Sequence, residues 1–211
     1  MIIIGITGSI GMGKTTISAM FRFLNIPVFD SDKEVNEILE KNEKVKEKIA
    51  DIWPETIISF QKEIKINKVL LSNKIFKKKH EKKTLEKIIH PLVKIKRKGF
   101  IEKYKECYFV GLDVPLLYET GSDKECHYIF LANTSTKKQK EIVLKRQNMT
   151  EEKFNLINNS QWCFERKKKK KTFLISTSFG KLISFFIVLV YLLKIMISHK
   201  VINNERTSPR H

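Results

Sequence analysis

The chain opens with an apolar, largely β-branched run from Met1 to Thr7 that no charged side chain interrupts. Such a run is typical of a central strand in a parallel sheet, which is buried on both faces. A glycine-rich stretch, 8–13, follows it, and from Lys14 to Leu24 the apolar residues recur at helical spacing. A second short apolar run, Ile26–Phe29, ends at Asp30. The opening therefore predicts a strand, a glycine loop, a helix and a second strand.

The middle of the chain, about 33–104, has a different pattern. It is strongly charged, and its apolar residues mainly recur at helical spacing. Proline lacks the backbone N–H of a helix interior, so we expect Pro54 and Pro91 to break these helices and His90 to lie at a helix end. We interpret this segment as a helical insertion.

Strand character returns at Cys107–Val114 and again at Tyr128–Ala132. A helical pattern, Thr136–Arg146, follows, and either Thr134 or Ser135 is a suitable N-cap for it. Strands that alternate with helices favour an α/β fold with a doubly wound parallel sheet. We expect one domain over 1–198.

The last helical pattern, Leu182–Ile197, is almost wholly apolar. Its uncharged part, 182–193, is shorter than the roughly 20 residues that a membrane-spanning helix needs, and Lys194 interrupts it. A buried helix that spans no membrane is therefore expected, with a membrane-associated helix as the alternative. Residues 199–211 are polar and patternless, and we expect a disordered tail.

Composition permits a packed core, because 42% of the 211 residues are hydrophobic and 30% are charged. The formal net charge of +18 raises the question of a nucleic-acid partner. Much of the excess lies in lysine runs with little arginine and no interleaved aromatic residue, for example 167–171. Such runs favour a solvated surface, and nucleic-acid binding is the alternative.

The three cysteines form no C-x-x-C pair and give an odd count, so neither a disulfide framework nor a zinc site is indicated. The opening apolar run lacks the basic residues that precede a signal peptide's apolar region, and it leads directly into a glycine loop. We expect a cytoplasmic enzyme.

The segment Gly8–Thr15 matches the phosphate-binding pattern G-x-x-x-x-G-K-S/T in full, between a predicted strand and a predicted helix. Glycines let consecutive N–H groups converge on an anion, and the helix N-terminus adds partial positive charge. Lys14 would bind the β- and γ-phosphates of a nucleotide, and the Thr15 hydroxyl would bind Mg²⁺. The predicted ATP-binding residues are Gly8, Gly11, Met12, Gly13, Lys14, Thr15 and Thr16.

Two carboxylates, Asp30 and Asp32, follow the second predicted strand, at the sheet edge where ligands of parallel sheets bind. A carboxylate there can orient an attacking hydroxyl and take its proton. Aspartate is also a preferred N-cap, so the alternative to catalysis is that one of the two caps the helix predicted from Lys33.

Three further residues carry weaker signals. Asp113 ends a predicted strand, where the second acid of P-loop enzymes holds Mg²⁺ through water. Arg146 ends a predicted helix and is either a lid arginine over the phosphates or a surface residue. His90 alone is more often structural than catalytic.

Together these motifs resemble the dephospho-coenzyme A kinase family, in order, from Ile3 to about Ile175. The shared segments are GITGSIGMGKTT at 5–16, FDSD at 29–32, IIHPL at 88–92, LDVPLLYET at 112–120, KRQ at 145–147, MTEEKF at 149–154, and Gln161 with basic residues after it. The chain departs from the family late, with Lys171-Thr172 in place of Ala-Asp and with Trp162-Cys163-Phe164 after Gln161.

This resemblance implies a P-loop kinase-like three-layer fold, an acceptor-binding insertion at about 33–104 and a mobile lid within about 137–170. It implies transfer of the ATP γ-phosphate to the ribose 3′-hydroxyl of dephospho-coenzyme A, with Asp32 as the base and Lys14 and Arg146 as the other catalytic residues. The residues that it places on the acceptor side are Asp32, His90, Pro115, Leu116 and Glu119.

Two alternatives stay open at the level of sequence. One is another P-loop kinase, for a nucleoside, a nucleotide or a sugar acid. The other is a basic nucleic-acid-binding ATPase, which would show a steep salt dependence and arginine or aromatic contacts.

Overall fold

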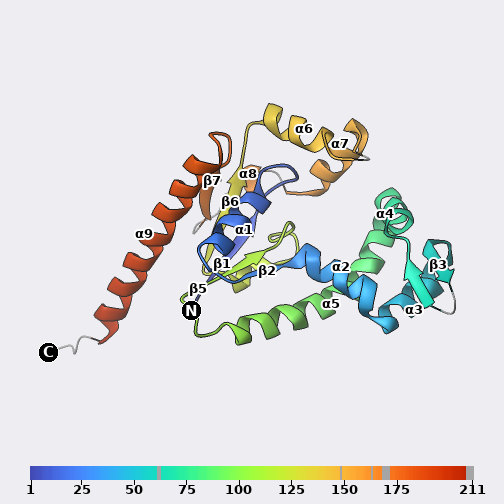
Figure 1. Cartoon of the computed structure of the whole chain (residues 1–211), viewed down its shortest axis with the longest axis horizontal. Coiled ribbons are helices and arrows are strands. Elements are labelled where there is room, and N and C mark those ends of the chain that lie inside the picture. The colour runs from blue at the N-terminus through green and yellow to red at the C-terminus, as the bar shows by residue number, and fades with distance from the viewer. Residues whose placement is uncertain (61–62, 148, 163, 168–171, 208–211) are drawn as a thin grey trace. The chain divides into compact units, whose positions relative to one another are not determined.

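The structure is a computed structural model that describes residues 1–60, 63–147, 149–162, 164–167 and 172–207 (Figure 1). The chain divides into two compact units. Unit 1 consists of Met1–Val28 and Glu106–His211, and unit 2 consists of Phe29–Lys105. Unit 2 is therefore inserted, in sequence, between the two parts of unit 1.

The larger sheet has five strands in the order β2-β5-β1-β6-β7; β2 spans the boundary after Val28, and the other strands belong to unit 1. The strands are β1 (Ile2–Thr7), β2 (Val28–Asp30), β5 (Phe109–Asp113), β6 (Tyr128–Asn133) and β7 (Thr172–Ser176). Strand β1 pairs in parallel with both β5 and β6, and β6 pairs in parallel with β7. All six residues of β1 are buried, so the predicted central strand is confirmed. The mostly parallel sheet confirms the predicted α/β fold.

Helices α1 (Lys14–Phe23) and α9 (Lys181–Thr207) pack on this sheet and form one hydrophobic core with it. The other helices of unit 1 are η2 (Ser122–Glu125), α6 (Thr136–Leu144), α7 (Glu151–Ser160) and α8 (Phe164–Lys167). Phe21 of α1 and Val188 of α9 are fully buried and join Ile4, Phe130 and Ile175 of the strands in one hydrophobic cluster. This packing fixes α1 on the sheet, and α1 begins where the glycine loop ends.

Unit 2 is mainly helical, as the pattern predicted, but it also contains an antiparallel pair of strands. Its elements are α2 (Ser31–Lys41), α3 (Glu43–Ile52), η1 (Pro54–Thr56), β3 (Ile57–Phe60), β4 (Glu63–Ile66), α4 (Lys68–Lys77) and α5 (Lys79–Lys103). The pairing of β3 with β4 was not predicted, because each strand is short and the partners are selected by contacts across the hairpin. Trp53 is 1% exposed and donates from Nε1 to Glu81 Oε2 at 2.6 Å, which anchors the core of this unit.

The expected helix break at Pro91 is wrong. Helix α5 continues through Pro91, although proline removes one backbone hydrogen bond. Ile89 and Val93, on either side of it, are 3% and 8% exposed, and their packing outweighs the local preference. His90 accordingly lies inside a helix rather than at its end. Pro54 does follow the end of α3 and begins η1.

Helix α9 is longer than predicted, because it extends to Thr207 through residues that were expected to be disordered. Within the described part of the chain, one segment, Lys181–His199, is long and apolar enough to cross a membrane by length and composition. The segment contains two lysines, Lys181 and Lys194, and it is apolar enough to cross a membrane despite them. Cys107 and Cys126 are thiols, as expected, and Cys163 lies outside the described residues.

Candidate active site

The loop from Gly8 to Lys14 joins β1 to α1. Gly11 and Gly13 have φ angles of 76° and 95°, a left-handed conformation that favours glycine. A Cβ atom on Gly13 would lie 2.7 Å from the Thr177 side chain, so only glycine fits there. Thr177, directly after β7, donates from Oγ1 to the Met12 carbonyl at 2.9 Å. The loop is therefore held in shape before any ligand binds.

Two glutamines hold the tip of this loop from outside. Gln161 accepts from the Ile10 N–H at 3.1 Å, and Gln139 donates from Nε2 to the Ile10 carbonyl at 2.7 Å. Gln139 is on α6, and Gln161 follows α7. Gln161 was part of the sequence pattern, whereas Gln139 was missed, because nothing near it in the sequence indicates a contact with the loop.

Lys14 and Asp113 meet at the edge of the sheet. Strands β1 and β5 are parallel neighbours, so the helix after β1 and the last residue of β5 lie at the same edge. Lys14 Nζ forms an ion pair with Asp113 Oδ1, and Ser18 donates from Oγ to Asp113 Oδ2 at 2.5 Å. Asp113 is 2% exposed, so its charge depends on these partners. Ser18 was missed, although it is one helical turn after Lys14.

Thr15 and Asp113 supply a hydroxyl and a carboxylate, the oxygen ligands that Mg²⁺ prefers. Thr15 is exposed beside the loop. No group of three or more His, Cys, Asp or Glu side chains that suits a metal occurs among the residues that the structure describes. A Mg²⁺ ion held by these two side chains would take its remaining ligands from phosphate oxygens and water.

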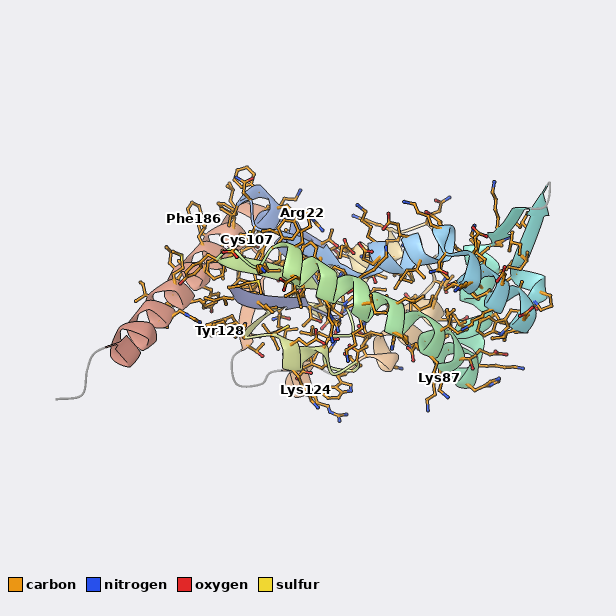
Figure 2. All side chains as sticks on the ribbon, turned by 90° about the horizontal axis from the view of Figure 1, so that it is seen from below. Arg22, Lys87, Cys107, Lys124, Tyr128 and Phe186 are labelled. Atoms are coloured by element: carbon orange, nitrogen blue, oxygen red, sulfur yellow. The ribbon has the colours of Figure 1, made fainter. Side chains whose placement is uncertain are left out.

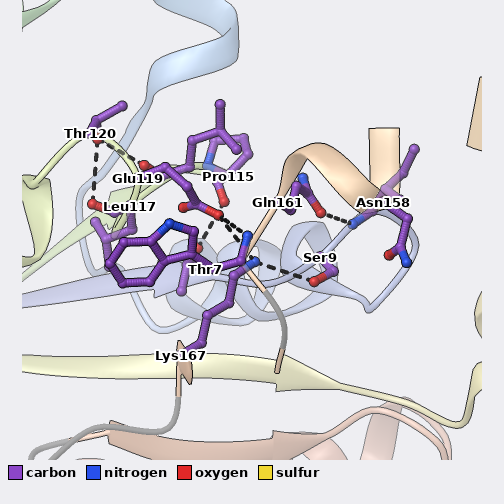
Figure 3. A network of polar contacts seen from close by, with 12 residues as sticks. Thr7, Ser9, Pro115, Leu117, Glu119, Thr120, Asn158, Gln161 and Lys167 are labelled. Atoms are coloured by element: carbon purple, nitrogen blue, oxygen red, sulfur yellow. Dashed lines mark hydrogen bonds and ion pairs between the residues drawn. The ribbon is translucent and has the colours of Figure 1, made fainter. Parts of the chain in front are cut away.

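The segment after β5 is tied to the loop by a polar network (Figure 3). Thr7 donates from Oγ1 to the Pro115 carbonyl at 3.1 Å. Glu119 Oε1 accepts from the Trp162 N–H at 2.7 Å and lies 3.7 Å from Lys167 Nζ, which also donates to Ser9 Oγ at 3.3 Å. The Lys167 side chain is fully buried and was missed, because it lies in a lysine run that was interpreted as surface.

Aromatic side chains enclose this network. Tyr118 stacks on Trp162 with ring centroids 6.0 Å apart, and Arg166 lies over the Trp162 ring at 3.8 Å. Burial raises the pKa of the Tyr118 phenol, partly offset by a 3.0 Å hydrogen bond between Tyr118 and Thr172. Trp162 thus packs inside unit 1, and Lys171, the other departure from the family pattern, lies outside the described residues.

The two aspartates after β2 have different places. Asp30 is the N-cap of α2 and accepts from the Lys33 N–H at 3.1 Å, so the capping alternative holds for Asp30. The helix begins at Ser31, two residues earlier than expected. Asp32 is exposed in the first turn and is not the cap.

Some of the predicted site residues lie together, and others lie apart from them. The structure brings the loop, Lys14 and Asp113 together in unit 1, with Glu119 joined to them through Lys167 and Ser9. Leu116 is half-buried, and its carbonyl accepts from Thr120 Oγ1 at 2.8 Å. Arg146 is exposed just after α6.

His90 and Asp32 belong to unit 2, which is described by itself. His90 is exposed on α5 and lines an open pocket of about 570 Å³ there. The other lining residues are Lys83, Glu86, Lys87, Pro91 and Lys94.

The chain is similar to known proteins along most of its length. The family model described as dephospho-CoA kinase matches residues 2–180. A dephospho-CoA kinase of Bartonella henselae is 38% identical over 179 residues, which are 84% of this chain and 89% of that protein. One of Rhodopseudomonas palustris (strain HaA2) is 35% identical over 182 residues, which are 85% of this chain and 88% of that protein.

Solved structures agree in fold. The crystal structure of TT1252 from Thermus thermophilus has a TM-score of 0.76 and 27% identity, covering 92% of this chain and 96% of that one. A dephospho-CoA kinase from Campylobacter jejuni has a TM-score of 0.67 at 22% identity, covering 93% and 98%. With the phosphate-binding loop and the Lys14–Asp113 pair in place, the family match over 2–180 shows that this chain belongs to the dephospho-CoA kinase family.

Proposed function

We propose that this protein is an ATP-dependent kinase that transfers the γ-phosphate of ATP to the ribose 3′-hydroxyl of dephospho-CoA. The observation that carries the proposal is the family match over residues 2–180. Relatives named dephospho-CoA kinase, 34–38% identical over most of the chain, support the same substrate. We also propose that the enzyme works in the cytoplasm, where ATP is plentiful.

The triphosphate would bind to the glycine loop. The N–H groups of Gly11, Met12, Gly13, Lys14, Thr15 and Thr16, together with the α1 N-terminus, would surround the β- and γ-phosphates, and Gly8 would let the chain approach β6. A Cβ on Gly8 would lie 3.0 Å from that of Ala132, which supports this close approach. Lys14 would exchange part of its contact with Asp113 for the phosphates as the nucleotide enters.

Mg²⁺ would be held by the Thr15 hydroxyl and, through water, by Asp113. When bound, it neutralises charge on the β- and γ-phosphates. Ser18 keeps the Asp113 carboxylate oriented through its 2.5 Å hydrogen bond while Lys14 changes partners. Arg146 would add positive charge over the transferred group if α6 and α7 act as the lid.

Asp32 would orient the ribose hydroxyl and take its proton late in the transfer, a role worth roughly 10²- to 10⁴-fold. His90, Pro115, Leu116 and Glu119 would line the acceptor side. Asp30 has a structural role as the helix cap, which supports Asp32 as the carboxylate available for chemistry.

The test combines substrate choice with a matched pair of variants. ADP release is followed in a coupled assay with dephospho-CoA, adenosine, AMP and gluconate as acceptors, and dephospho-CoA is expected to be the preferred acceptor by a wide margin. Asp32→Asn should lose at least about 100-fold in turnover at near-normal stability. Asp30→Ala should lose about 1 kcal/mol of stability and keep its rate per folded molecule.

Two results would reject these assignments. Preference for a nucleoside, nucleotide or sugar acid would reject the proposed substrate. An unchanged rate in Asp32→Asn, or a lost rate in Asp30→Ala, would reject Asp32 as the base.

A further inference from the structure

Helix α9 is apolar on two opposite faces. On one face Val188, Leu192 and Ile195 are at most 5% exposed and belong to the core cluster of unit 1. The Tyr191 ring lies 4.6 Å from that of Phe173 on β7, so the aromatic side chains strengthen this contact. One face of α9 is therefore part of the folded unit.

The opposite face is an uninterrupted apolar surface, here named the α9 stripe. From Ile183 to Ile197 its residues recur every three or four positions, and Leu182 precedes them, so they align along the helix. They are 49–75% exposed: Leu182, Ile183, Phe186, Val190, Leu193 and Ile197. Figure 2 labels Phe186 among the side chains of this helix.

The apolar surface continues onto α1. Phe23 is 76% exposed, and its ring meets that of Phe185 edge-on with centroids 5.7 Å apart. Single exposed apolar side chains are ordinary, but a continuous row of this length marks an interaction surface.

The charge of the chain indicates what binds to the α9 stripe. The stripe contains no charged residue, and Lys181 and Lys194, both exposed, flank it. The whole chain carries a formal net charge of +18, which repels a second copy and attracts an anionic surface. Apolar residues that enter the acyl chains, with lysines at the level of anionic headgroups, are the features of a helix that lies in a membrane interface.

We propose that the α9 stripe docks unit 1 on the surface of an anionic lipid bilayer, with the helix lying in the interface plane. The helix is long enough to cross a bilayer, but crossing would remove Val188, Leu192 and Ile195 from the core of unit 1. Crossing would also place Lys194 within the acyl chains at considerable cost. Docking keeps the packed face on the sheet and removes only the exposed face from water.

This docking is separate from the proposed kinase reaction. The family match ends at residue 180, and α9 begins at Lys181. A change confined to the middle of the stripe should therefore alter membrane binding and leave turnover on dephospho-CoA unchanged.

The test uses the full chain and sedimentation with vesicles, either of phosphatidylcholine alone or of equal parts phosphatidylcholine and phosphatidylglycerol. Binding to the mixed vesicles is expected, weaker binding to phosphatidylcholine alone, and weakening by salt. The triple variant Phe186→Gln, Val190→Gln, Leu193→Gln should bind the mixed vesicles at least about 100-fold more weakly, since it loses three large apolar side chains.

The matched control is Val69→Gln, Leu70→Gln, Ile95→Gln, three apolar residues of unit 2 that are 64%, 47% and 66% exposed. It should bind vesicles as the wild type does. Unchanged kinase turnover in the stripe variant confirms that it is folded.

Four outcomes overturn the proposal. They are no binding to mixed vesicles, equal loss in the control, a dimer in free solution that the stripe variant abolishes, and recovery of the expressed chain in carbonate-resistant membranes. The third result assigns the stripe to a second copy, and the fourth makes α9 a membrane span.

Discussion

Replacing Lys167 with methionine should strongly destabilise the protein, because it removes a buried charge whose partner remains. Lys167 Nζ lies 3.7 Å from Glu119 Oε1, and the two side chains are 0% and 14% exposed. At that separation a pair of unit charges interacts by about 4 kcal/mol for an effective dielectric constant of roughly 20. Methionine fills nearly the same volume, so the change leaves no cavity and removes the charge together with the hydrogen bond to Ser9 Oγ.

The expected loss for Lys167→Met is about 3 kcal/mol. Breaking one side of a buried pair typically costs about 3 to 5 kcal/mol. We expect the lower end of this range, because Glu119 still accepts a hydrogen bond from the Trp162 N–H at 2.7 Å and is partly exposed. The double variant Lys167→Met, Glu119→Gln removes both charges and should recover most of the loss, leaving it within about 1 kcal/mol of the wild type.

Urea unfolding followed by circular dichroism and by tryptophan fluorescence measures these differences. Of the two tryptophans, Trp162 lies in the network and Trp53 in the core of unit 2, so the fluorescence follows the site and unit 2 together. The unfolding midpoint of Lys167→Met should fall with no change in the slope m. If Lys167→Met loses less than about 1 kcal/mol, or if the double variant loses as much as the single one, the ion pair does not stabilise this site and the reasoning is refuted.

Two further predictions concern the phosphate site and unit 2. Lys14→Ala should lose at least about 100-fold in phosphoryl transfer per folded molecule, because Lys14 is a cation of the loop, and it should also lower stability, because Asp113 keeps a buried charge without its ion pair; normal turnover per folded molecule would contradict this. Glu37 accepts hydrogen bonds from Lys41 and Lys96, which lower its pKa from 4.5 to about 2. Because the folded pKa is the lower one, these contacts stabilise the protein above pH 4.5 and are lost as the pH falls toward 2. NMR titration of the Glu37 carboxyl should give a midpoint near 2 that rises in high salt, whereas a midpoint near 4.5 at low salt would contradict the pairing.

Local signals in the sequence determined the phosphate-binding loop and the fold class. A buried parallel strand needs an uninterrupted apolar run, and the left-handed turns at Gly11 and Gly13 need glycine, so both features are visible in consecutive residues. The strand end at Asp113 was visible for the same reason. These local features, in order along the chain, also carried the resemblance to the dephospho-CoA kinase family.

Only the tertiary structure decided which distant side chains meet. Lys167 looked like one of many surface lysines, and only folding brings it to Glu119 and Ser9. The same holds for Gln139, which contacts the loop from another helix. The sequence pattern of a lysine or a glutamine does not encode its partner, because the partner is selected by the packing of whole elements.

Tertiary packing also overrode local preference in the helices. Pro91 should break a helix by its own chemistry, but burial of Ile89 and Val93 keeps α5 continuous. The sequence of α9 showed that the helix is apolar, and it could not show which face packs. The sheet buries Val188 and leaves Phe186 in solvent, since a sheet can cover only one side of a helix.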